Sequence, residues 1–347
     1  MTAARTLWLI DEGHHGHRAQ SEGLAQALEA AVGPLEIIRI PCAERIRGAL
    51  RPAARLLLDH APARLTLTLT RRLSTFDAPS SPAPTLILSS GGRTAFASRA
   101  LARATGAPNV FVGDNRPFPA RWFSAVMAPT PHPWAENVLD TGFVPSTMTP
   151  ARCAEAAARR WDGAPPREVC ALLVGGASRS HLWRAEDFAR LGRAATMLAQ
   201  AHGIRWLVTT SRRTGAEGDR ALATALAPEA VAERVLFSEA PEPVVAAYLG
   251  AARAVYVTQD SATMLSEAAA AGRPTMAVAP PETRLPETGS FAQLLTRLDG
   301  APWIRRLDLD AMARTPPPAA AERPHDDVAS AMAAAAGALV ARLGLTR

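Results

Sequence analysis

The sequence predicts an α/β protein made of two doubly wound domains with largely parallel sheets. Short apolar runs alternate with helical segments along the 347 residues, which is the pattern of consecutive β–α–β units. The length is sufficient for two domains of ordinary size. Glycine-containing polar loops follow apolar runs in both halves of the chain. In a parallel sheet such loops lie at the carboxyl ends of strands, where α/β domains bind ligands.

The alternation of strands and helices is interrupted near the middle of the chain. Residues 145–167 are rich in Pro, Ala and Arg and are interpreted as a connection between domains. We therefore assign residues 1–150 to a first domain, residues 151–320 to a second domain and residues 321–347 to a C-terminal helix. Three consecutive prolines precede this helix and interrupt the chain. We expect the C-terminal helix to pack back on the first domain.

The composition predicts a globular protein in a reducing compartment. Hydrophobic residues make up 48% of the chain and charged residues 20%. No apolar run approaches the ~20 residues that a membrane span needs, and residues 1–6 lack the apolar region of a signal peptide. The cysteines Cys42, Cys153 and Cys170 are far apart and form no CxxC pair. We expect free thiols and a cytoplasmic location.

The net charge of +6 is concentrated in one segment. Residues 39–72 carry eight arginines and two acidic residues, an excess equal to that of the whole chain, which has no lysine. Within it, residues 43–58 have apolar side chains at three- and four-residue spacing, which predicts an amphipathic helix. The segment is either a solvated helix face or a contact to an anionic membrane surface, such as the inner membrane. Nucleic acid is not expected, because aromatic stacking platforms are few.

Three polar loops of the first domain are expected to converge at one edge of its sheet. They are residues 11–17, 89–92 and 113–116, each after an apolar run. The first loop holds three histidines, which titrate near neutral pH. Because two of them are adjacent and no tetrahedral ligand set is completed, we expect no metal. The candidate residues of this acceptor side are Gly13, Gly16, His17, Gln20, Gly91, Gly92 and Asp114.

The second domain has four corresponding loops, including residues 175–178, 209–214 and 258–261. They supply backbone donors, hydroxyls and two adjacent arginines, which can hold a diphosphate without a metal. Asp260 and Ser261 are good N-cap residues for the helix that follows, whose N-terminus favours an anion. The alternative is a capped crossover helix with no ligand. The candidate donor-side residues are Gly175, Gly176, Ser178, Ser211, Arg212, Arg213, Asp260, Ser261 and Glu267.

Two segments resemble nucleotide-sugar glycosyltransferases of the GT-B type. Residues 267–274, EAAAAGRP, lie before an apolar run and look like the E-A-x-x-x-G-x-P segment of those enzymes. This resemblance implies that Glu267 binds the nucleotide ribose and that the preceding turn and helix start hold the diphosphate. Residues 86–92, LILSSGG, are similar to the acceptor-side loop of the peptidoglycan N-acetylglucosaminyltransferase, in which a histidine also closes the first glycine loop, as His17 does here.

A closer resemblance covers nearly the whole chain. DEGHHGHRAQ at 11–20, LLVGGAS at 172–178, VTTSRRT at 208–214 and VTQDSATMLSE at 257–267 resemble the bacterial relatives of the plant mitochondrial-fission "elongated mitochondria" protein. This resemblance implies a GT-B-like fold, in which two Rossmann-like domains face a cleft.

The first functional hypothesis is a metal-independent glycosyltransferase that needs no cofactor. Ser178 and Ser261 would bind the phosphates of a nucleotide-diphosphate sugar, and Arg212 or Arg213 would stabilise the leaving diphosphate. His17 is the candidate general base, with Asp114 as the alternative.

Two other hypotheses remain open. A nucleotide-sugar epimerase would need additional carboxylates, which Asp11, Glu12 and Asp114 could supply. A non-catalytic GT-B-shaped protein at a membrane surface would use the basic segment 39–72.

Overall fold

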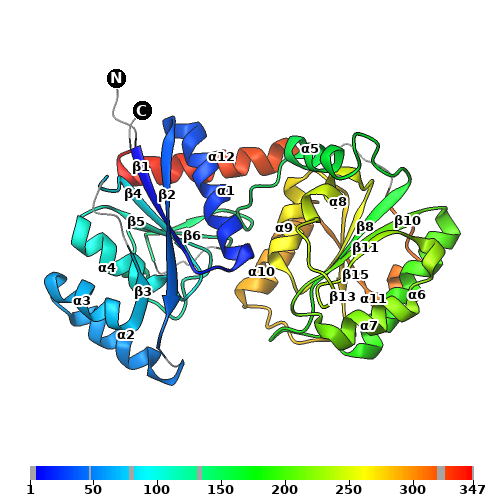
Figure 1. The fold of residues 1–347 in the computed structure, drawn as a ribbon, viewed down its shortest axis with the longest axis horizontal. Coiled ribbons are helices and arrows are strands. Elements are labelled where there is room, and N and C mark those ends of the chain that lie inside the picture. Colours follow the sequence, from blue (N-terminus) through cyan, green and yellow to red (C-terminus); the bar gives the residue numbers. More distant parts are fainter. Residues whose placement is uncertain (1–4, 47, 78–81, 131–134, 319–324, 346–347) are drawn as a thin grey trace. The chain divides into compact units, whose positions relative to one another are not determined.

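The computed structural model describes residues 5–46, 48–77, 82–130, 135–318 and 325–345 (Figure 1). The chain divides into two compact units, one of Met1–Thr147 with Ser330–Arg347 and one of Met148–Ala329. Each unit has helices packed around a sheet that is largely or wholly parallel. The predicted class, two doubly wound α/β units, is confirmed.

The first unit contains a seven-stranded sheet in the order β3-β2-β1-β4-β5-β6-β7. Only the pairing of β2 with β3 is antiparallel. The strands are β1 (Arg5–Asp11), β2 (Leu35–Glu44), β3 (Ser74–Phe76), β4 (Leu86–Ser90), β5 (Asn109–Val112), β6 (Ala125–Ala128) and β7 (Val138–Asp140). The helices are α1 (His15–Val32), α2 (Arg51–His60), α3 (Ala63–Leu73), α4 (Ala95–Thr105) and α12 (His325–Leu343), with short 3-10 turns η1 (Gly48–Leu50) and η2 (Ala120–Trp122).

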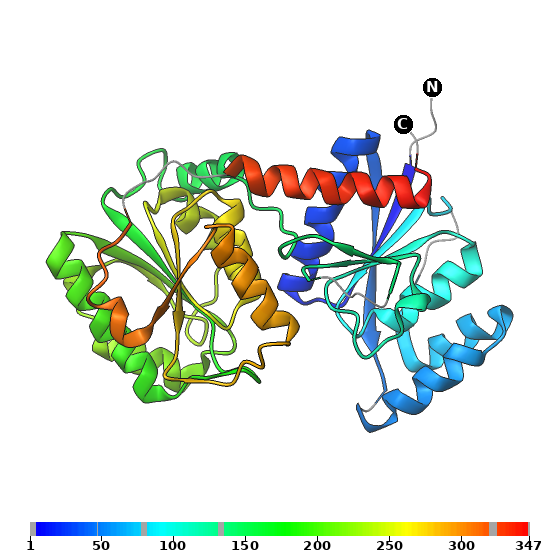
Figure 2. The same ribbon diagram turned by 180° about the vertical axis from the view of Figure 1, so that it is seen from behind.

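The C-terminal helix completes one face of this sheet. Alternation along β1 sends Leu7 and Leu9 to the face covered by α1 and α12, where Ala336 and Leu339 are fully buried beside them. The Arg342 guanidinium donates to the backbone carbonyls of Ser124 and Glu136. Figure 2 shows α12 from behind. The expectation that the C-terminal helix packs back on the first domain is confirmed.

The second unit contains a six-stranded parallel sheet in the order β11-β10-β8-β12-β13-β15. Its strands are β8 (Val169–Val174), β10 (Arg205–Thr210), β11 (Val231–Val235), β12 (Val255–Thr258), β13 (Thr275–Ala279) and β15 (Arg305–Asp308), and a small antiparallel pair joins β9 (His181–Leu182) and β14 (Glu282–Thr283). The helices are α5 (Pro150–Arg160), α6 (Ala185–His202), α7 (Gly215–Ala225), α8 (Val245–Ala251), α9 (Ala262–Ala270), α10 (Ser290–Gly300) and α11 (Leu309–Met312), with a 3-10 turn η3 (Pro228–Ala230).

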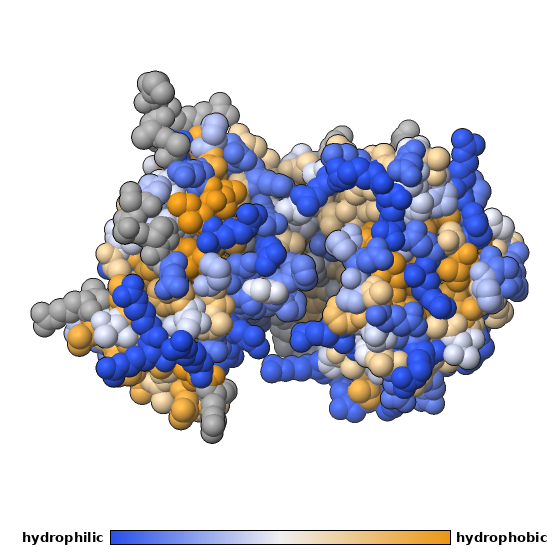
Figure 3. All heavy atoms as spheres, in the orientation of Figure 1, coloured by the Kyte–Doolittle hydropathy of each residue, from blue (hydrophilic) through white to orange (hydrophobic). Residues whose placement is uncertain are grey.

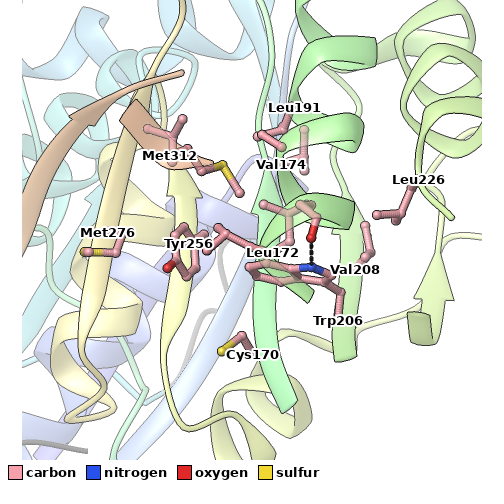
Figure 4. Packing of buried hydrophobic residues seen from close by; sticks show 14 of the residues in the cluster. Cys170, Leu172, Val174, Leu191, Trp206, Val208, Leu226, Tyr256, Met276 and Met312 are labelled. Atoms are coloured by element: carbon pink, nitrogen blue, oxygen red, sulfur yellow. Dashed lines mark hydrogen bonds between the residues drawn. The ribbon is translucent and has the colours of Figure 1, made fainter. Parts of the chain in front are cut away.

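The core of the second unit forms around the central strands β8, β10 and β12. Every residue of β8 is buried, as expected for a parallel strand with helices on both faces. Figure 4 shows the cluster of Leu172, Trp206 and Tyr256, in which the Trp206 indole N–H donates to the Ala195 carbonyl at 2.7 Å. This hydrogen bond satisfies the one polar atom of a fully buried indole.

Three predicted boundaries differ from the structure. Helix α1 begins at His15, inside the predicted loop 11–17, so Gly16, His17 and Gln20 lie in its first turns. The segment 43–58 is not one helix: β2 extends to Glu44, and α2 begins at Arg51. Residues 145–167 contain α5, which begins after Thr149 because the Thr149 side chain accepts from the Arg152 backbone N–H.

Candidate functional site

The polar loops of the first unit follow the neighbouring strands β1, β4 and β5. Because these strands are parallel, the loops meet at one edge of the sheet. Gln20 links them: its side-chain carbonyl accepts from the Ser90 hydroxyl at 3.2 Å and lies against Gly113. The structure thus brings together residues from all three predicted acceptor-side loops.

His17 and Glu12 form a hydrogen-bonded pair in this cluster. His17 Nδ1 and Glu12 Oε1 are 2.6 Å apart, and Glu12 Oε2 accepts from the Arg93 backbone N–H at 3.1 Å. The Glu12 side chain is 7% exposed, whereas His17 is 36% exposed. Burial raises the pKa of Glu12, but the His17 and Arg93 contacts outweigh this effect and lower that pKa below its ordinary value. An ionised Glu12 therefore orients the His17 ring through Nδ1, and the other ring nitrogen, His17 Nε2, is left to accept a proton.

Gly91 is required where the second loop approaches this pair. Its φ is +87°, and a Cβ there would overlap the His17 ring and the Glu12 carboxylate. At Gly92 a Cβ would make only an ordinary contact with Phe118 at 3.6 Å. Gly13 has a φ of +79° with open space around it. Gly91 is therefore the glycine that the pair depends on.

Asp114 has a different environment from His17. Its carboxylate accepts from the Arg116 side chain, with Nε to Oδ1 at 2.9 Å, and from the Arg116 backbone N–H at 3.0 Å. The Asp114 side chain is 41% exposed. A carboxylate held by a guanidinium is a weaker proton acceptor, because the positive charge stabilises its ionised form. His17 is the better placed of the two predicted bases.

In the second unit, three polar loops are joined by hydrogen bonds. They follow β8, β10 and β12, which are neighbours in the sheet. The Gly175 N–H donates to Thr258 Oγ1 at 2.6 Å, and the Ser211 hydroxyl donates to the Gly175 carbonyl at 3.0 Å. Thr214 donates to the same carbonyl. These bonds hold the glycine loop between the other two loops.

Asp260 is the charged centre of this arrangement. Its side chain has no exposed surface, and Oδ2 accepts from the Gly176 N–H at 3.0 Å and from Arg213 Nη2 at 2.6 Å. A Cβ at Gly175 would overlap the Asp260 carboxylate, and one at Gly176 would overlap the Arg213 carbonyl. Burial raises the pKa of Asp260 even though Arg213 and the Gly176 N–H act in the opposite direction.

Of the two residues predicted as N-caps of α9, Ser261 is confirmed and Asp260 is not. The N-cap is Ser261, whose Oγ accepts from the Met264 backbone N–H at 3.4 Å. Asp260 instead takes the position that an anion would occupy between Gly176 and Arg213. These two residues are therefore already engaged within the unit.

Other donor-side residues keep unused donors. Ser178 Oγ accepts from the backbone N–H groups of Ser180 and His181, at 3.3 and 3.1 Å, and forms a hydroxyl–hydroxyl hydrogen bond of 3.4 Å with Ser180. When Ser180 donates in that bond, the Ser178 proton is available to another acceptor. Arg212 is exposed, and within the described ranges its guanidinium makes no ion pair. Ser261 likewise accepts one bond at Oγ and retains its proton.

Glu267 is buried within α9. It is 8% exposed, and among the residues described its carboxylate has neither a hydrogen-bond donor nor an ion-pair partner. Burial raises its pKa to about 7. An unpaired buried carboxylate is costly for folding, and such groups concentrate at functional sites.

Sequence reasoning missed three members of these clusters. Glu12 was proposed only for an epimerase, although its spacing of five residues from His17 allowed the pair. Thr258 was included in the predicted loop 258–261, but its hydrogen bond to the Gly175 N–H was not predicted. His181 lies 1% exposed beside the Ser178 turn, with Nδ1 3.0 Å from Ser180 Oγ, and burial followed by Arg213 and Arg306 lowers its pKa to about 4.

The described ranges show neither a metal-ion cluster nor a membrane-spanning helix. These residues contain no group of three or more His, Cys, Asp or Glu side chains arranged to hold a metal ion. None of their helices combines the length and apolar character of a membrane span. The cysteines Cys42, Cys153 and Cys170 are free and buried.

Two Rossmann-like units with polar loops at their strand ends define the GT-B fold class, and solved structures agree. Arabidopsis thaliana UGT89C1 in complex with UDP-L-rhamnose matches with a TM-score of 0.51 and 13% identity, over 99% of this chain and 100% of that one. A putative UDP-N-acetylglucosamine 2-epimerase from Listeria monocytogenes gives 0.53 and 13%, over 99% and 98%. The glycotransferase of kitacinnamycin gives 0.50 and 14%, over 100% and 97%. At these identities the likeness concerns the fold.

The family follows from the sequence itself. The model of the family described as mitochondrial fission ELM1 matches residues 15–342. The chain belongs to this family. A comparison with curated proteins gave no significant match.

Proposed function

We propose that this protein is a metal-independent glycosyltransferase whose donor is a nucleotide-diphosphate sugar. The observation that carries the proposal is Glu267, a buried carboxylate without a partner among the described residues, in the helix that follows β12. The two hydroxyls of a ribose would supply the hydrogen bonds that this carboxylate lacks. The UDP-L-rhamnose complex of a protein with the same fold supports a donor of this class.

The diphosphate is assigned to the start of α9 and the turns beside it. The first N–H groups of a helix are unpaired within the helix and carry partial positive charge. Ser178 and Ser261 add hydroxyl donors. Arg212 stabilises the leaving diphosphate, since its charge is not compensated by an ion pair within the described ranges. Arg213 has a positioning role, because Asp260 already balances its charge.

The first unit supplies the base in this proposal. An acceptor hydroxyl gives its proton to His17 Nε2 as its oxygen bonds to the anomeric carbon of the donor sugar. The bond from that carbon to the diphosphate oxygen breaks, and the electron pair leaves with the diphosphate. Glu12 stabilises the imidazolium that forms, since its carboxylate lies 2.6 Å from Nδ1.

An epimerase is the second candidate, because a putative epimerase shares the fold. The carboxylates that it would use are engaged, however. Asp11 pairs with Arg18 at 2.6 Å and Asp114 pairs with Arg116, which leaves Glu12 attached to His17. These ion pairs favour transfer over epimerisation. Solvent deuterium incorporated into a donor sugar without any acceptor would reverse this preference.

The proposal is tested by screening nucleotide sugars in a thermal-shift assay with EDTA present. A ligand at a hundred times its Kd stabilises the folded state by about 2.7 kcal/mol, which is expected to raise Tm by about 5 °C or more. The shift should grow with ligand concentration and be unaffected by the chelator. Millimolar UDP-, GDP-, ADP- and TDP-sugars that all leave Tm unchanged would contradict the proposal.

A further inference from the structure

Exposed large hydrophobic side chains gather on one part of the first unit. Six such residues occur in the described part of the chain, and four of them lie between residues 48 and 73. Single exposed leucines are ordinary on a soluble protein, but a group on adjacent helices marks an interaction surface. The four are Leu50 at 60% exposure, Leu56 at 64%, Leu57 at 54% and Leu65 at 49%.

The helices α2 and α3 present these leucines because each is amphipathic. Ala54 and Leu58 of α2 are buried in a core cluster with Phe96 and Trp122, so Leu56 lies on the opposite side of the helix and Leu57 on its exposed flank. On α3 the exposed positions 65, 68 and 72 are three and four residues apart, which places them on one stripe. Both helices thus keep one face in the core and leave the other uncovered.

The charge of the same surface has one sign. Arg45, Arg71 and Arg72 are exposed. Both acidic residues of the segment 39–72 are partly buried and paired: Glu44 accepts from Arg51 Nε at 2.7 Å, and Asp59 accepts from the Trp122 indole N–H at 2.8 Å and pairs with Arg121. No carboxylate of this segment remains to neutralise the exposed arginines. Arg47 lies outside the described residues.

We propose that the surface formed by Arg45, Leu50, Leu56, Leu57, Leu65, Arg71 and Arg72, here called the α2–α3 surface, docks on an anionic lipid bilayer. Apolar side chains beside arginines suit the boundary between headgroups and acyl chains, where leucines insert and guanidinium groups meet lipid phosphates. Figure 3 shows hydrophobic and strongly hydrophilic surface side by side where Figure 1 draws α2 and α3. A protein partner would not require an excess of positive charge.

The α2–α3 surface is connected to one of the acceptor-side loops of the first unit. The Arg55 guanidinium of α2 donates to the Pro117 carbonyl, in the loop that also carries Asp114. The bilayer would therefore lie next to one of the acceptor-side loops. The docking itself does not depend on the proposed transferase activity.

The test is co-sedimentation of the full chain with vesicles of phosphatidylcholine alone or with 30% phosphatidylglycerol, at low and high salt. The triple variant Leu56→Gln, Arg71→Gln, Arg72→Gln removes one exposed leucine and two charges. Its matched control is Met197→Gln, Arg193→Gln, Arg220→Gln, which changes an exposed methionine and two exposed arginines of the second unit. Circular dichroism and Tm should be unchanged in both variants, because every substituted side chain is exposed.

The wild type is expected to bind the anionic vesicles, and high salt should release it. Loss of two arginines, each contributing about a factor of five at an anionic surface, lowers the partition coefficient of the triple variant by about thirtyfold, whereas the control retains wild-type binding. An equal loss in the control, or equal binding to neutral vesicles, would overturn the assignment. Absence of vesicle binding by the wild type would also overturn the assignment. If size exclusion then shows that the triple variant disrupts self-association, the surface is a protein interface instead.

Discussion

The polar loops of the two units differ in how their charged groups are satisfied. In the first unit, Glu12 is buried with a lowered pKa, and it holds a half-exposed histidine. In the second unit, Asp260 is buried with a raised pKa and holds the loops together, while Glu267 has no partner among the described residues. In the first unit the charged groups are paired and His17 remains accessible. In the second unit Asp260 is buried and fixed by hydrogen bonds, and Glu267 is the carboxylate that lacks a partner among the described residues.

The first arrangement suits a general base, and the second suits a ligand-binding site. A general base needs an oriented ring that reaches solvent, which the His17–Glu12 pair provides. A binding site needs rigid loops with a few unused hydrogen-bonding groups, which Glu267, Ser178 and Arg212 provide. The glycines follow the same division, because Gly91 makes room for the His17–Glu12 pair and Gly175 makes room for the Asp260 carboxylate.

Replacing the base should have the largest effect. His17→Ala is expected to lower the rate of nucleoside-diphosphate release from the donor by about 10²- to 10⁴-fold, because proton transfer is lost. The affinity for the donor should stay the same, as measured by calorimetry. His15→Ala is the matched control, since His15 is an exposed neighbour in the same helix. A variant at position 17 with normal turnover would assign the base elsewhere.

Removal of the structural carboxylate is expected to act on stability. Asp260→Ala leaves the buried Gly176 N–H without an acceptor and removes the partner of Arg213, whose side chain is 36% exposed; this should cost about 1–3 kcal/mol in the free energy of unfolding measured with urea. Glu155→Ala breaks an exposed pair with Arg159 and should cost no more than about 0.5 kcal/mol. Equal changes in the free energy of unfolding for the two substitutions would show that Asp260 does not stabilise the loops of the second unit.

The buried carboxylate of Glu267 should make stability depend on pH. Its pKa is about 7 in the folded state and near 4.5 in the unfolded state. Stability is therefore fully present below about pH 4.5 and falls as the pH rises toward 7, because the unfolded chain loses this proton first. Glu267→Gln should gain up to about 3 kcal/mol over the wild type at pH 8 and little at pH 5. A gain of the same size at both pH values would rule out ionisation as its cause.

Much of the fold could be predicted from local sequence. Central strands such as β8 and β13 are continuous apolar runs followed by glycine or proline, which local sequence identifies. Edge strands β3, β7 and β15 are only three or four residues long, and local sequence does not identify them because their pairing depends on tertiary neighbours. The early start of α1 was also missed.

The site was predicted at the level of loops rather than contacts. Small and polar residues after strands located the loops, although α1 begins at His15 within the first of them. The role of Asp260 could not be predicted, because its partners Gly176 and Arg213 are 84 and 47 positions away in the chain. A cap and a buried ion pair use the same residue type, and only the packing of three strands distinguishes them.

The most direct test is calorimetric titration of UDP and GDP into the wild type and into Glu267→Ala at pH 8, where the carboxylate is ionised. Ser266→Ala is the neighbouring control on the same helix. We predict that one nucleotide binds the wild type and the control and that Glu267→Ala abolishes this binding. Tight binding that is unchanged by Glu267→Ala, or no binding of any nucleotide to the wild type, would contradict the donor site proposed for the second unit.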